Sequence, residues 1–264
     1  MKQFLRGRGV ETVCEQAMCP NIGECFSRKQ ATFLILGRHC TRHCSFCNIA
    51  KGQPSAPDPQ EPAKVAEAVE SLALKHVVIT SVTRDDLADG GAGMFAQTIL
   101  LIRKKTPGVT IEVLIPDFKL SLPSLAAVAS AKPDIIAHNV ETVPPLYPLV
   151  RREADYRRSL GVLSALKKIS PGIKTKSGIM LGLGEKKEEV IQVLRDLRRA
   201  GCDFLSIGQY LAPSRKHYPV KEYVRPEEFR EYRTKALEAG FLHVESSPYV
   251  RSSYQAEEYL HAAE

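Results

Sequence analysis

Residues 38–48 read RHCTRHCSFCN, and their cysteines decide how the rest of the chain is interpreted. Cys40, Cys44 and Cys47 are spaced C-x3-C-x2-C, and the aromatic Phe46 stands just before the last of them. Three thiols cannot all pair as disulfides, and three alone do not complete a four-ligand zinc site. They suit three corners of an iron–sulfur cube, whose irons are normally held by cysteine thiolates. The fourth iron would lack a protein ligand, which leaves an open position for a substrate or cofactor.

A second triplet lies upstream, within CEQAMCPNIGEC, and consists of Cys14, Cys19 and Cys25 at C-x4-C-x5-C spacing. Pro20, Asn21 and Gly23 interrupt this stretch and predict a loop in place of a helix. Two triplets so close along the chain favour two separate metal centres over one shared site. Zinc bound with a distant fourth ligand, such as His39, His43 or another cysteine, is the alternative.

The bulk composition is that of an ordinary globular protein. The 264 residues suffice for one large α/β domain or two small ones, and 44% hydrophobic residues can supply its core. No apolar run approaches the roughly 20 residues of a membrane helix, and the first residues lack the apolar core of a secretory signal. We therefore expect a cytoplasmic protein without a membrane partner, in which clustered cysteines favour metal over disulfides.

The formal net charge of +7 comes from basic residues that are spread along the chain. No nucleic-acid recognition motif accompanies them, and they do not gather in one stripe. Solvated helix faces therefore explain the charge better than a nucleic-acid partner does.

Short apolar runs alternate with segments of helical periodicity from residue 32 onward. Six strand–helix pairs with no break in composition predict one α/β domain, and six units fall short of the eight in a closed barrel. We expect a partial, open TIM-type barrel. Cys202 stands alone before one predicted strand and is interpreted as a small buried hydrophobe. The strands are expected at residues 32–36, 76–80, 110–115, 135–138, 174–180, 204–208 and 242–245, and the helices at 63–73, 94–105, 122–131, 156–169, 187–200 and 227–239.

Polar or glycine-rich sequence follows each of the first six predicted strands. The cysteine loop follows the first, TSVTRDD at 80–86 the second and HNVET at 138–142 the fourth. Because the carboxyl ends of barrel strands share one rim, the sequence predicts a single active site there. Arg84, Asp85 and Asp86 either bind a carboxylate or ribose or form a structural ion-pair network, and both interpretations stay open.

The spacing within residues 40–47, with an aromatic before the third cysteine, resembles the radical SAM superfamily. The two triplets together with RSSY at 251–254 are far more specific, and with them the chain resembles the lipoyl synthase family over nearly its whole length. The stretches TSVTRDDLADGG, EVLIPDFK, HNVETV, TKSGIMLGLGE and IGQYLAPSRKHYPV also resemble that family. Composition alone, by contrast, would make RSSY a helix N-cap.

The resemblance implies a role for the first triplet. Cys40, Cys44 and Cys47 would hold a 4Fe–4S cluster whose open iron binds S-adenosylmethionine, and an electron would cleave this cofactor to a deoxyadenosyl radical. Such a radical suits unactivated C–H bonds, which no general base can deprotonate. We expect side chains on the rim to bind the cofactor, with Phe46 beside the adenine: Phe46, Thr83, Arg84, Asn139, Glu141 and Lys176.

The resemblance also implies an auxiliary 4Fe–4S cluster on Cys14, Cys19 and Cys25 as the sulfur source. A serine of RSSY would be its fourth ligand, and we assign Ser253, with Ser252 as the second choice. The implied substrate is an octanoyl chain, amide-linked to a lysine of a lipoyl carrier protein or a dehydrogenase E2 subunit, with sulfur inserted at carbons 6 and 8. A reductant such as ferredoxin or flavodoxin and an iron–sulfur carrier that rebuilds the cluster complete the expected partners.

These assignments predict three segments. Residues 1–30 would carry the auxiliary cluster, residues 31–247 the barrel, and residues 248–264 a tail with RSSY, with both end segments capping the rim. Two other functions use the same cysteines: a radical methylthiotransferase acting on RNA, and a zinc-stabilised nucleic-acid-binding protein. The first is disfavoured because 264 residues contain no added RNA-binding module.

Overall fold

The computed structural model describes residues 1–261 and forms two compact units. The first unit comprises residues 1–42 and 48–136, and the second comprises residues 43–47 and 137 onward. The predicted alternation of strands and helices is confirmed in both units, with boundaries that differ by one or two residues at most places. No helix among the described residues is long and apolar enough to span a bilayer.

In the first unit, the strands lie in the neighbour order β1, β2, β5, β6, β7, and β2, β5 and β6 run parallel. β1 adds to β2 in the antiparallel direction. This order is the one expected when each crossover helix returns the chain to the next strand of a parallel sheet. The strands are β1 (Glu11–Thr12), β2 (Thr32–Ile35), β5 (His76–Ser81), β6 (Thr110–Leu114) and β7 (Ile135–Ala137), and the helices between them are α4 (Glu61–Ser71), α5 (Ala92–Lys105) and α6 (Leu122–Ser130).

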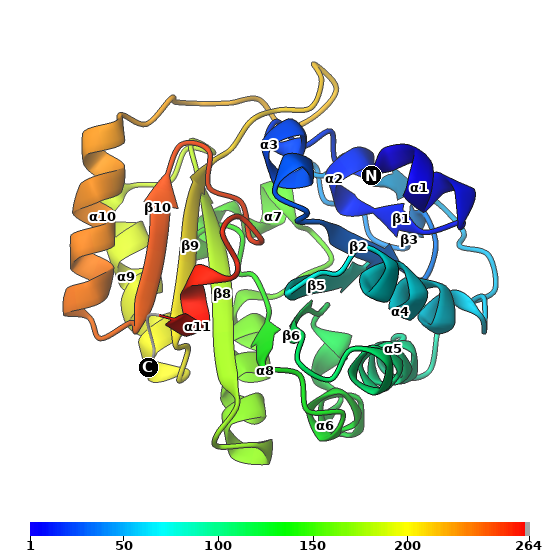
Figure 1. Ribbon diagram of the computed structural model, residues 1–264. Helices are drawn as coiled ribbons and strands as arrows, with labels where there is room; N and C mark the ends of the chain where they lie inside the picture. The colour runs from blue at the N-terminus through cyan, green and yellow to red at the C-terminus, as the bar shows by residue number, and fades with distance from the viewer. Residues whose placement is uncertain (262–264) are drawn as a thin grey trace. The chain divides into compact units, whose positions relative to one another are not determined.

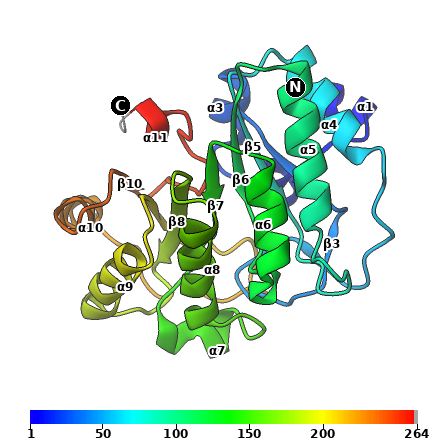
Figure 2. The ribbon, with the colours of Figure 1, turned by 90° about the horizontal axis from the view of Figure 1, so that it is seen from below.

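The three helices of this unit cover one face of its strands, with α5 between α4 and α6 (Figure 2). Helix α5 buries Phe95, Ile99 and Ile102 completely, at spacings of four and three residues. This spacing places the three side chains on one helix face, against the apolar strands. Its last turn is basic, with Arg103, Lys104 and Lys105 beside the negative end of the helix dipole.

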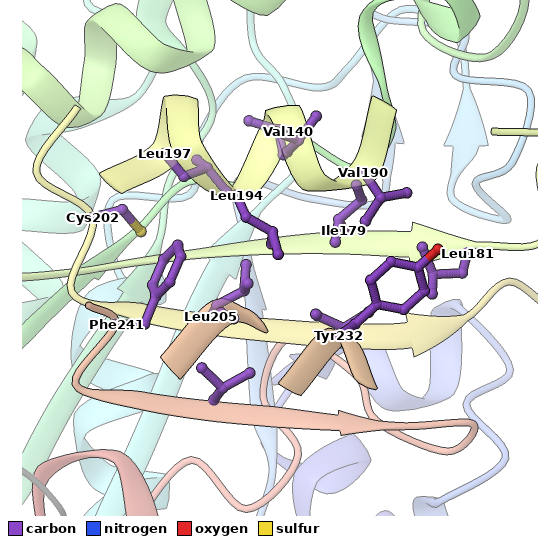
Figure 3. Packing of buried hydrophobic residues seen from close by; sticks show 14 of the residues in the cluster. Val140, Ile179, Leu181, Val190, Leu194, Leu197, Cys202, Leu205, Tyr232 and Phe241 are labelled. Carbon is purple, nitrogen blue, oxygen red and sulfur yellow. The ribbon is translucent and has the colours of Figure 1, made fainter. Parts of the chain in front are cut away.

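In the second unit, β8, β9 and β10 form parallel pairs in that order, and α9 and α10 pack beside them (Figure 1). Helix α9 buries Val190, Val193, Leu194 and Leu197, which is the i, i+3, i+4, i+7 pattern of an amphipathic helix. All four belong to one apolar cluster, and Figure 3 shows Val190, Leu194 and Leu197 on the side of α9 that faces Ile179 and Leu205 of the strands. The elements are α8 (Tyr156–Ile169), β8 (Lys174–Leu181), α9 (Lys187–Arg199), β9 (Phe204–Gln209), α10 (Pro226–Glu238), β10 (His243–Ser247) and α11 (Glu258–His261).

The opposite face of these three strands carries α11 (Figures 1 and 2). The ring of Tyr259 lies 5.5 Å from that of Phe204 and 4.9 Å from that of His243, centroid to centroid. The Nζ atom of Lys176 lies 3.7 Å from the Tyr259 centroid. Lys176 and His243 both pair in register with Phe204, so one aromatic side chain covers three neighbouring strands.

The N-terminal segment differs from the predicted loop. It contains the short helices α1 (Lys2–Gly7), α2 (Val13–Gln16) and α3 (Ile22–Ser27), the last of which includes Gly23. Pro20 does separate α2 from α3, and Asn21 occupies the N-cap position of α3. A glycine costs only about 1 kcal/mol inside a helix, so a one-and-a-half-turn helix tolerates it. The remaining short elements are β3 (His39–Cys40), β4 (Ala50–Lys51), η1 (Phe118–Leu120), η2 (Pro144–Leu146) and α7 (Tyr147–Val150).

The interpretation of Cys202 as a buried hydrophobe is confirmed. Its side chain is fully buried in the apolar cluster between α9, α10 and the strands (Figure 3). Burial raises the pKa of the Cys202 thiol to about 12, with the nearby Asp203 carboxylate adding to the shift. The thiol is therefore protonated at neutral pH and chemically inert.

We expect Cys202 to resist alkylation in the folded, metal-free protein at pH 8, because a pKa near 12 leaves about one thiolate in ten thousand. The partly exposed Cys40, Cys44 and Cys47 provide the internal comparison and should be modified readily. Iodoacetamide labelling followed by peptide mass spectrometry, with and without urea, measures this. Labelling of Cys202 as fast as Cys44 before unfolding would contradict its placement in the core.

Candidate active site

The first cysteine triplet begins at a short parallel pair of strands. Cys40 ends β3, which pairs with β4, and the Gly52 N–H donates to the Cys40 carbonyl at 3.2 Å. The Arg42 N–H donates to Cys40 Sγ at 3.4 Å. Cys40 belongs to the first unit, whereas Cys44 and Cys47 belong to the second.

A buried arginine fixes the residues that follow Cys40. The Arg42 side chain is only 6% exposed and bonds two carboxylates, with Nε to Asp85 at 2.6 Å and Nη2 to Asp117 at 2.7 Å. Burial alone would lower the pKa of Arg42, but its hydrogen bonds to Asp117 and Asp85 reverse the effect and raise the pKa. Asp85 follows β5 and Asp117 follows β6, so the cysteine loop is fastened to the carboxyl ends of both strands.

The neighbouring Thr41 also attaches the cysteine loop to the segment that follows β5. Thr41 donates to the Thr83 carbonyl through both its N–H, at 3.1 Å, and its Oγ1, at 3.0 Å. The same Oγ1 accepts from the Asp85 N–H at 3.1 Å. Thr83, a predicted cofactor-binding residue, is thus placed beside the cysteine loop through its backbone.

Arg84 takes part in a separate ion pair. Its side chain is 2% exposed and donates to Asp86 at 2.9 Å from Nε and 2.8 Å from Nη2, while Nη1 donates to the Leu36 carbonyl at 3.2 Å. The Arg84 guanidinium in turn lowers the pKa of Asp86. These contacts support the ion-pair interpretation of this stretch, and a cofactor role for Arg84 stays a prediction.

In the second unit, the segment 43–47 is held by backbone bonds. The Ser45 N–H donates to the Val150 carbonyl at 2.9 Å, and the Tyr218 N–H donates to the Ser45 carbonyl at 2.9 Å. The Cys47 N–H donates to the Cys44 carbonyl at 3.2 Å, which closes a tight turn between the two cysteines. Phe46 packs on a small apolar cluster of Val150, Leu183 and Tyr210.

Just after β7, Asn139 forms hydrogen bonds with two other candidate site residues, Glu141 and Ser252. Asn139, 6% exposed, donates through Nδ2 to Glu141 Oε1 at 3.1 Å and to Ser252 Oγ at 2.6 Å. Glu141 has a φ of 66°, rare for a residue with a side chain, and strain of this kind gathers at functional sites. Gly178 explains the close packing here, since a Cβ atom at that position would lie 2.9 Å from Asn139 Oδ1.

Arg151 stands beside this group, and sequence reasoning missed it. It is 9% exposed, and its Nη1 donates to the carbonyls of Asn139 at 3.0 Å and Val140 at 2.9 Å. Burial opposes its charge, but the neighbouring Tyr147, Glu141 and Cys44 raise its pKa, so the guanidinium stays cationic near Cys44. Nothing in the sequence separates Arg151 from the exposed Arg152, because burial alone distinguishes them.

The hydrogen bonding of Arg151 indicates whether an anionic group fits next to Cys44. Its Nε is buried and has no hydrogen-bond partner among residues 1–261. A buried donor without an acceptor costs about 1–3 kcal/mol. Burial also raises the pKa of Glu141, against the opposing effects of Arg151 and Asn139. A negatively charged group bound next to Cys44 would satisfy the arginine, so the residues present fit a thiolate-bound cluster and a carboxylate-bearing cofactor.

The rim placement predicted for Lys176 is wrong. Lys176 is the third residue of the eight-residue strand β8, well before its carboxyl end, and its amino group lies under the ring of Tyr259. The side chain is 1% exposed. A cofactor role for Lys176 stays a prediction, but its position on the strand no longer supports it.

The tail motif is a turn and does not cap a helix. The Tyr254 N–H donates to the Arg251 carbonyl at 2.9 Å, and α11 begins only at Glu258. The tail lies close to β9, because a Cβ atom at Gly208 would fall 2.1 Å from the Val250 carbonyl oxygen. Ser252 and Ser253 are both partly buried.

The second cysteine triplet lies within the first unit. The Cys19 N–H donates to the Cys14 carbonyl at 3.0 Å, and the Cys25 N–H donates to the Asn21 carbonyl at 2.9 Å. Burial raises the pKa of Cys14; hydrogen bonds with Thr32 oppose this effect, and the charge of Cys19 adds to it. Cys14 is buried, whereas Cys19 and Cys25 are partly exposed, and all three are free thiols.

No three His, Cys, Asp or Glu side chains converge on a single ion within the part of the chain that the structure describes. In an iron–sulfur cube each thiolate binds a different iron, so the sulfurs stand apart. Each triplet supplies three cysteine sulfurs, which is the donor type that such a cube takes.

Known proteins resemble this chain in sequence and in fold. The sequence model of the Radical SAM superfamily matches residues 34–197, which is more than half of the chain. Lipoyl synthase from Geotalea daltonii is 59% identical over 98% of this chain and 88% of its own length, and lipoyl synthase from Geobacter metallireducens is 60% identical over 98% and 91%. The crystal structure of methylornithine synthase shares the fold, with a TM-score of 0.59 at 16% identity over 81% of this chain and 70% of that one. The predicted fold class, a partial TIM-type barrel of the radical SAM type, is confirmed.

We expect Asp117→Ala to destabilise the protein by about 3 kcal/mol, because it leaves the buried Arg42 with one carboxylate in place of two. Urea unfolding of the metal-free protein, followed by circular dichroism, measures the change. Glu70→Ala is the matched control, since Glu70 pairs with Lys105 at the surface of the same unit, with side chains 52% and 36% exposed. Equal effects of the two substitutions would show that the Arg42 pair does not hold the cysteine loop.

Proposed function

The chain belongs to the lipoyl synthase family of the radical SAM superfamily, and we propose that its two cysteine triplets hold two different clusters for that family's reaction. It is a radical SAM sulfurtransferase, whose reaction inserts two sulfur atoms at carbons 6 and 8 of an octanoyl chain on a protein lysine. The family uses a 4Fe–4S cluster and S-adenosylmethionine. When bound, the two clusters and S-adenosylmethionine would supply the one-electron chemistry and the sulfur, which amino-acid side chains cannot provide.

In this proposal Cys40, Cys44 and Cys47 hold the cluster that binds S-adenosylmethionine. Two contacts of these cysteines support this assignment. The Arg42 N–H donates to Cys40 Sγ, and the Arg151 cation lies near Cys44. Both place a hydrogen-bond donor or a positive charge next to a cysteine sulfur, where the negative charge of a bound cluster would lie. The bonds from Thr41, Arg42 and Ser45 then fix the loop, so that metal binding does not have to order it.

We assign cofactor binding to the residues around this triplet. Asn139 and Glu141 are the best supported, because they bond each other at the carboxyl end of β7 beside the unsatisfied Nε of Arg151. An amide, a carboxylate and a guanidinium suit the ribose hydroxyls, the ammonium and the carboxylate of S-adenosylmethionine. The full proposed set is Phe46, Thr83, Arg84, Asn139, Glu141 and Lys176, with Arg151 added from the structure.

Cys14, Cys19 and Cys25 hold the auxiliary cluster in this proposal, with Ser253 as its fourth ligand. Ser252, whose hydroxyl accepts from Asn139, stays the second choice. A serine ligand is easily replaced, which suits a cluster that gives up its sulfur. Residues 1–30 would serve as the auxiliary-cluster segment, residues 31–247 as the barrel and residues 248–264 as the tail that brings RSSY to it.

The reaction requires an octanoylated carrier protein and a reductant. We propose that the carrier is a lipoyl carrier protein or a dehydrogenase E2 subunit, and that a ferredoxin or flavodoxin supplies electrons. An iron–sulfur carrier would rebuild the consumed cluster. A cytoplasmic location fits seven cysteines without a disulfide among the described residues, since thiols stay reduced there.

The single observation that carries the proposal is the pair of free-thiol triplets in a chain related to lipoyl synthases over 98% of its length. Anaerobic reconstitution should load about eight irons per chain. Replacing the upstream triplet (Cys14, Cys19 and Cys25) by alanine should leave about four irons and retain S-adenosylmethionine cleavage. Replacing the downstream triplet (Cys40, Cys44 and Cys47) should also leave about four irons and abolish cleavage.

Cys202→Ala is the control for these iron counts and should keep about eight. Iron assays and chromatography of deoxyadenosine provide the two readouts. A wild-type count near four or near zero would rule out a second cluster or both clusters, respectively. Loss of iron in Cys202→Ala would point to a general loss of structure.

A further inference from the structure

The first serine of RSSY is hydrogen-bonded to the end of a strand. The Ser252 hydroxyl accepts from Asn139 Nδ2 at 2.6 Å, across 113 positions of sequence. Asn139 is 6% exposed and follows β7 directly. The bond therefore joins the tail to the strand end where we place the cofactor, and it is as short as a strong hydrogen bond.

The rest of the tail reaches the barrel at a different strand. The Gln209 N–H donates to the Pro248 carbonyl at 3.3 Å, and the Val250 carbonyl lies against Gly208, both at the end of β9. Arg251 Nη1 bonds carbonyls of the tail itself, at Pro248 and Val250. Ser252 thus adds a second attachment point, at β7, just where the turn carrying Ser253 begins.

Asn139 shares one nitrogen between two acceptors. An amide nitrogen carries two hydrogens, and here they are directed to Ser252 Oγ and to Glu141 Oε1. A cofactor that contacts Asn139 or Glu141 would act on the same amide group that holds Ser252. Coupling of this kind is reciprocal, so tail docking must change cofactor affinity by the same factor.

We propose that Ser252 is a positioning residue that couples S-adenosylmethionine binding at Asn139 and Glu141 to the placement of Ser253. Consecutive Cα atoms are about 3.8 Å apart, so anchoring Ser252 confines Ser253 to a small volume. The two hydroxyls then have separate tasks, one holding the turn and the other serving the auxiliary cluster. This inference rests on the proposed function, because it takes the cofactor site and the role of Ser253 from it.

The test compares Ser252→Ala, Ser252→Thr and Ser253→Ala in the full, reconstituted chain. Hydrogen exchange of residues 248–257 is measured with and without S-adenosylmethionine, and the dissociation constant of the cofactor is measured by equilibrium dialysis. In the wild type, the cofactor should slow exchange in this segment. Ser252→Ala should lose that protection and bind the cofactor about tenfold more weakly, the effect of one lost hydrogen bond.

The two comparison variants separate positioning from mere structure. Ser252→Thr keeps a hydroxyl and should restore both readouts, whereas Ser253→Ala should keep both and lose sulfur insertion. Unchanged protection and affinity in Ser252→Ala would overturn the proposal, and so would equal losses in the alanine and threonine variants at position 252. If Ser252→Ala fails to load its clusters, exchange in the metal-free proteins still tests the anchor: wild type protected and variant unprotected supports it, and equal exchange overturns it.

Failure of this inference is distinguishable from failure of the proposed function. A wild-type protein that binds S-adenosylmethionine and protects its tail but inserts no sulfur would contradict the function and leave the anchor intact. A wild-type protein that inserts sulfur while Ser252→Ala behaves identically would contradict only the anchor.

Discussion

A buried cation, bonded to two carboxylates, holds the start of the cysteine loop against the strand ends of the first unit. Arg42 lies between Cys40 and Cys44 in sequence and bonds Asp85 and Asp117 at distances of 2.6–2.9 Å. The Arg42 and Asp117 side chains are only 6% and 1% exposed, and removing these two charges from water costs several kcal/mol per ion, which good geometry has to recover. The loop therefore cannot move away without leaving buried charges unpaired. The cysteine loop is held in place by charge, whereas the strands that carry it are held by apolar packing.

The second unit places its own buried cation beside the other part of the motif. Arg151 is anchored by the carbonyls of Asn139 and Val140, and its charge acts on Cys44 and Glu141. Unlike Arg42, it keeps one donor, Nε, without an acceptor in the part of the chain that the structure describes. The charge of Arg42 is thus paired with carboxylates of the protein, whereas the Nε of Arg151 would gain an acceptor from a bound anion. That difference is the physical reason to place Arg151 in the cofactor site.

Sequence reasoning succeeded wherever a period or a donor set carries the information. Val190, Val193, Leu194 and Leu197 mark α9 by their spacing alone, and the spacing of the cysteines indicates the family without any fold. It failed where only three-dimensional surroundings matter. Polar sequence follows the strand that contains Lys176, but Lys176 itself lies near the start of β8, far from the carboxyl end where the site is expected. Its amino group lies under the ring of Tyr259, a residue more than 80 positions away. Arg151 and Arg152 are identical in type and adjacent, so only the fold shows which is buried. The bond between Asn139 and Ser252 joins two ordinary polar residues and has no local signature.

In the proposed function, this chain supplies sulfur to its substrate from a cluster that it carries. The most direct measurement loads both clusters with isotopically heavy sulfide, removes free sulfide, and follows one anaerobic turnover on an octanoyl-lysine peptide by mass spectrometry. We predict a product that contains two heavy sulfur atoms. A product without added sulfur, or one whose sulfur carries no label, would contradict the account.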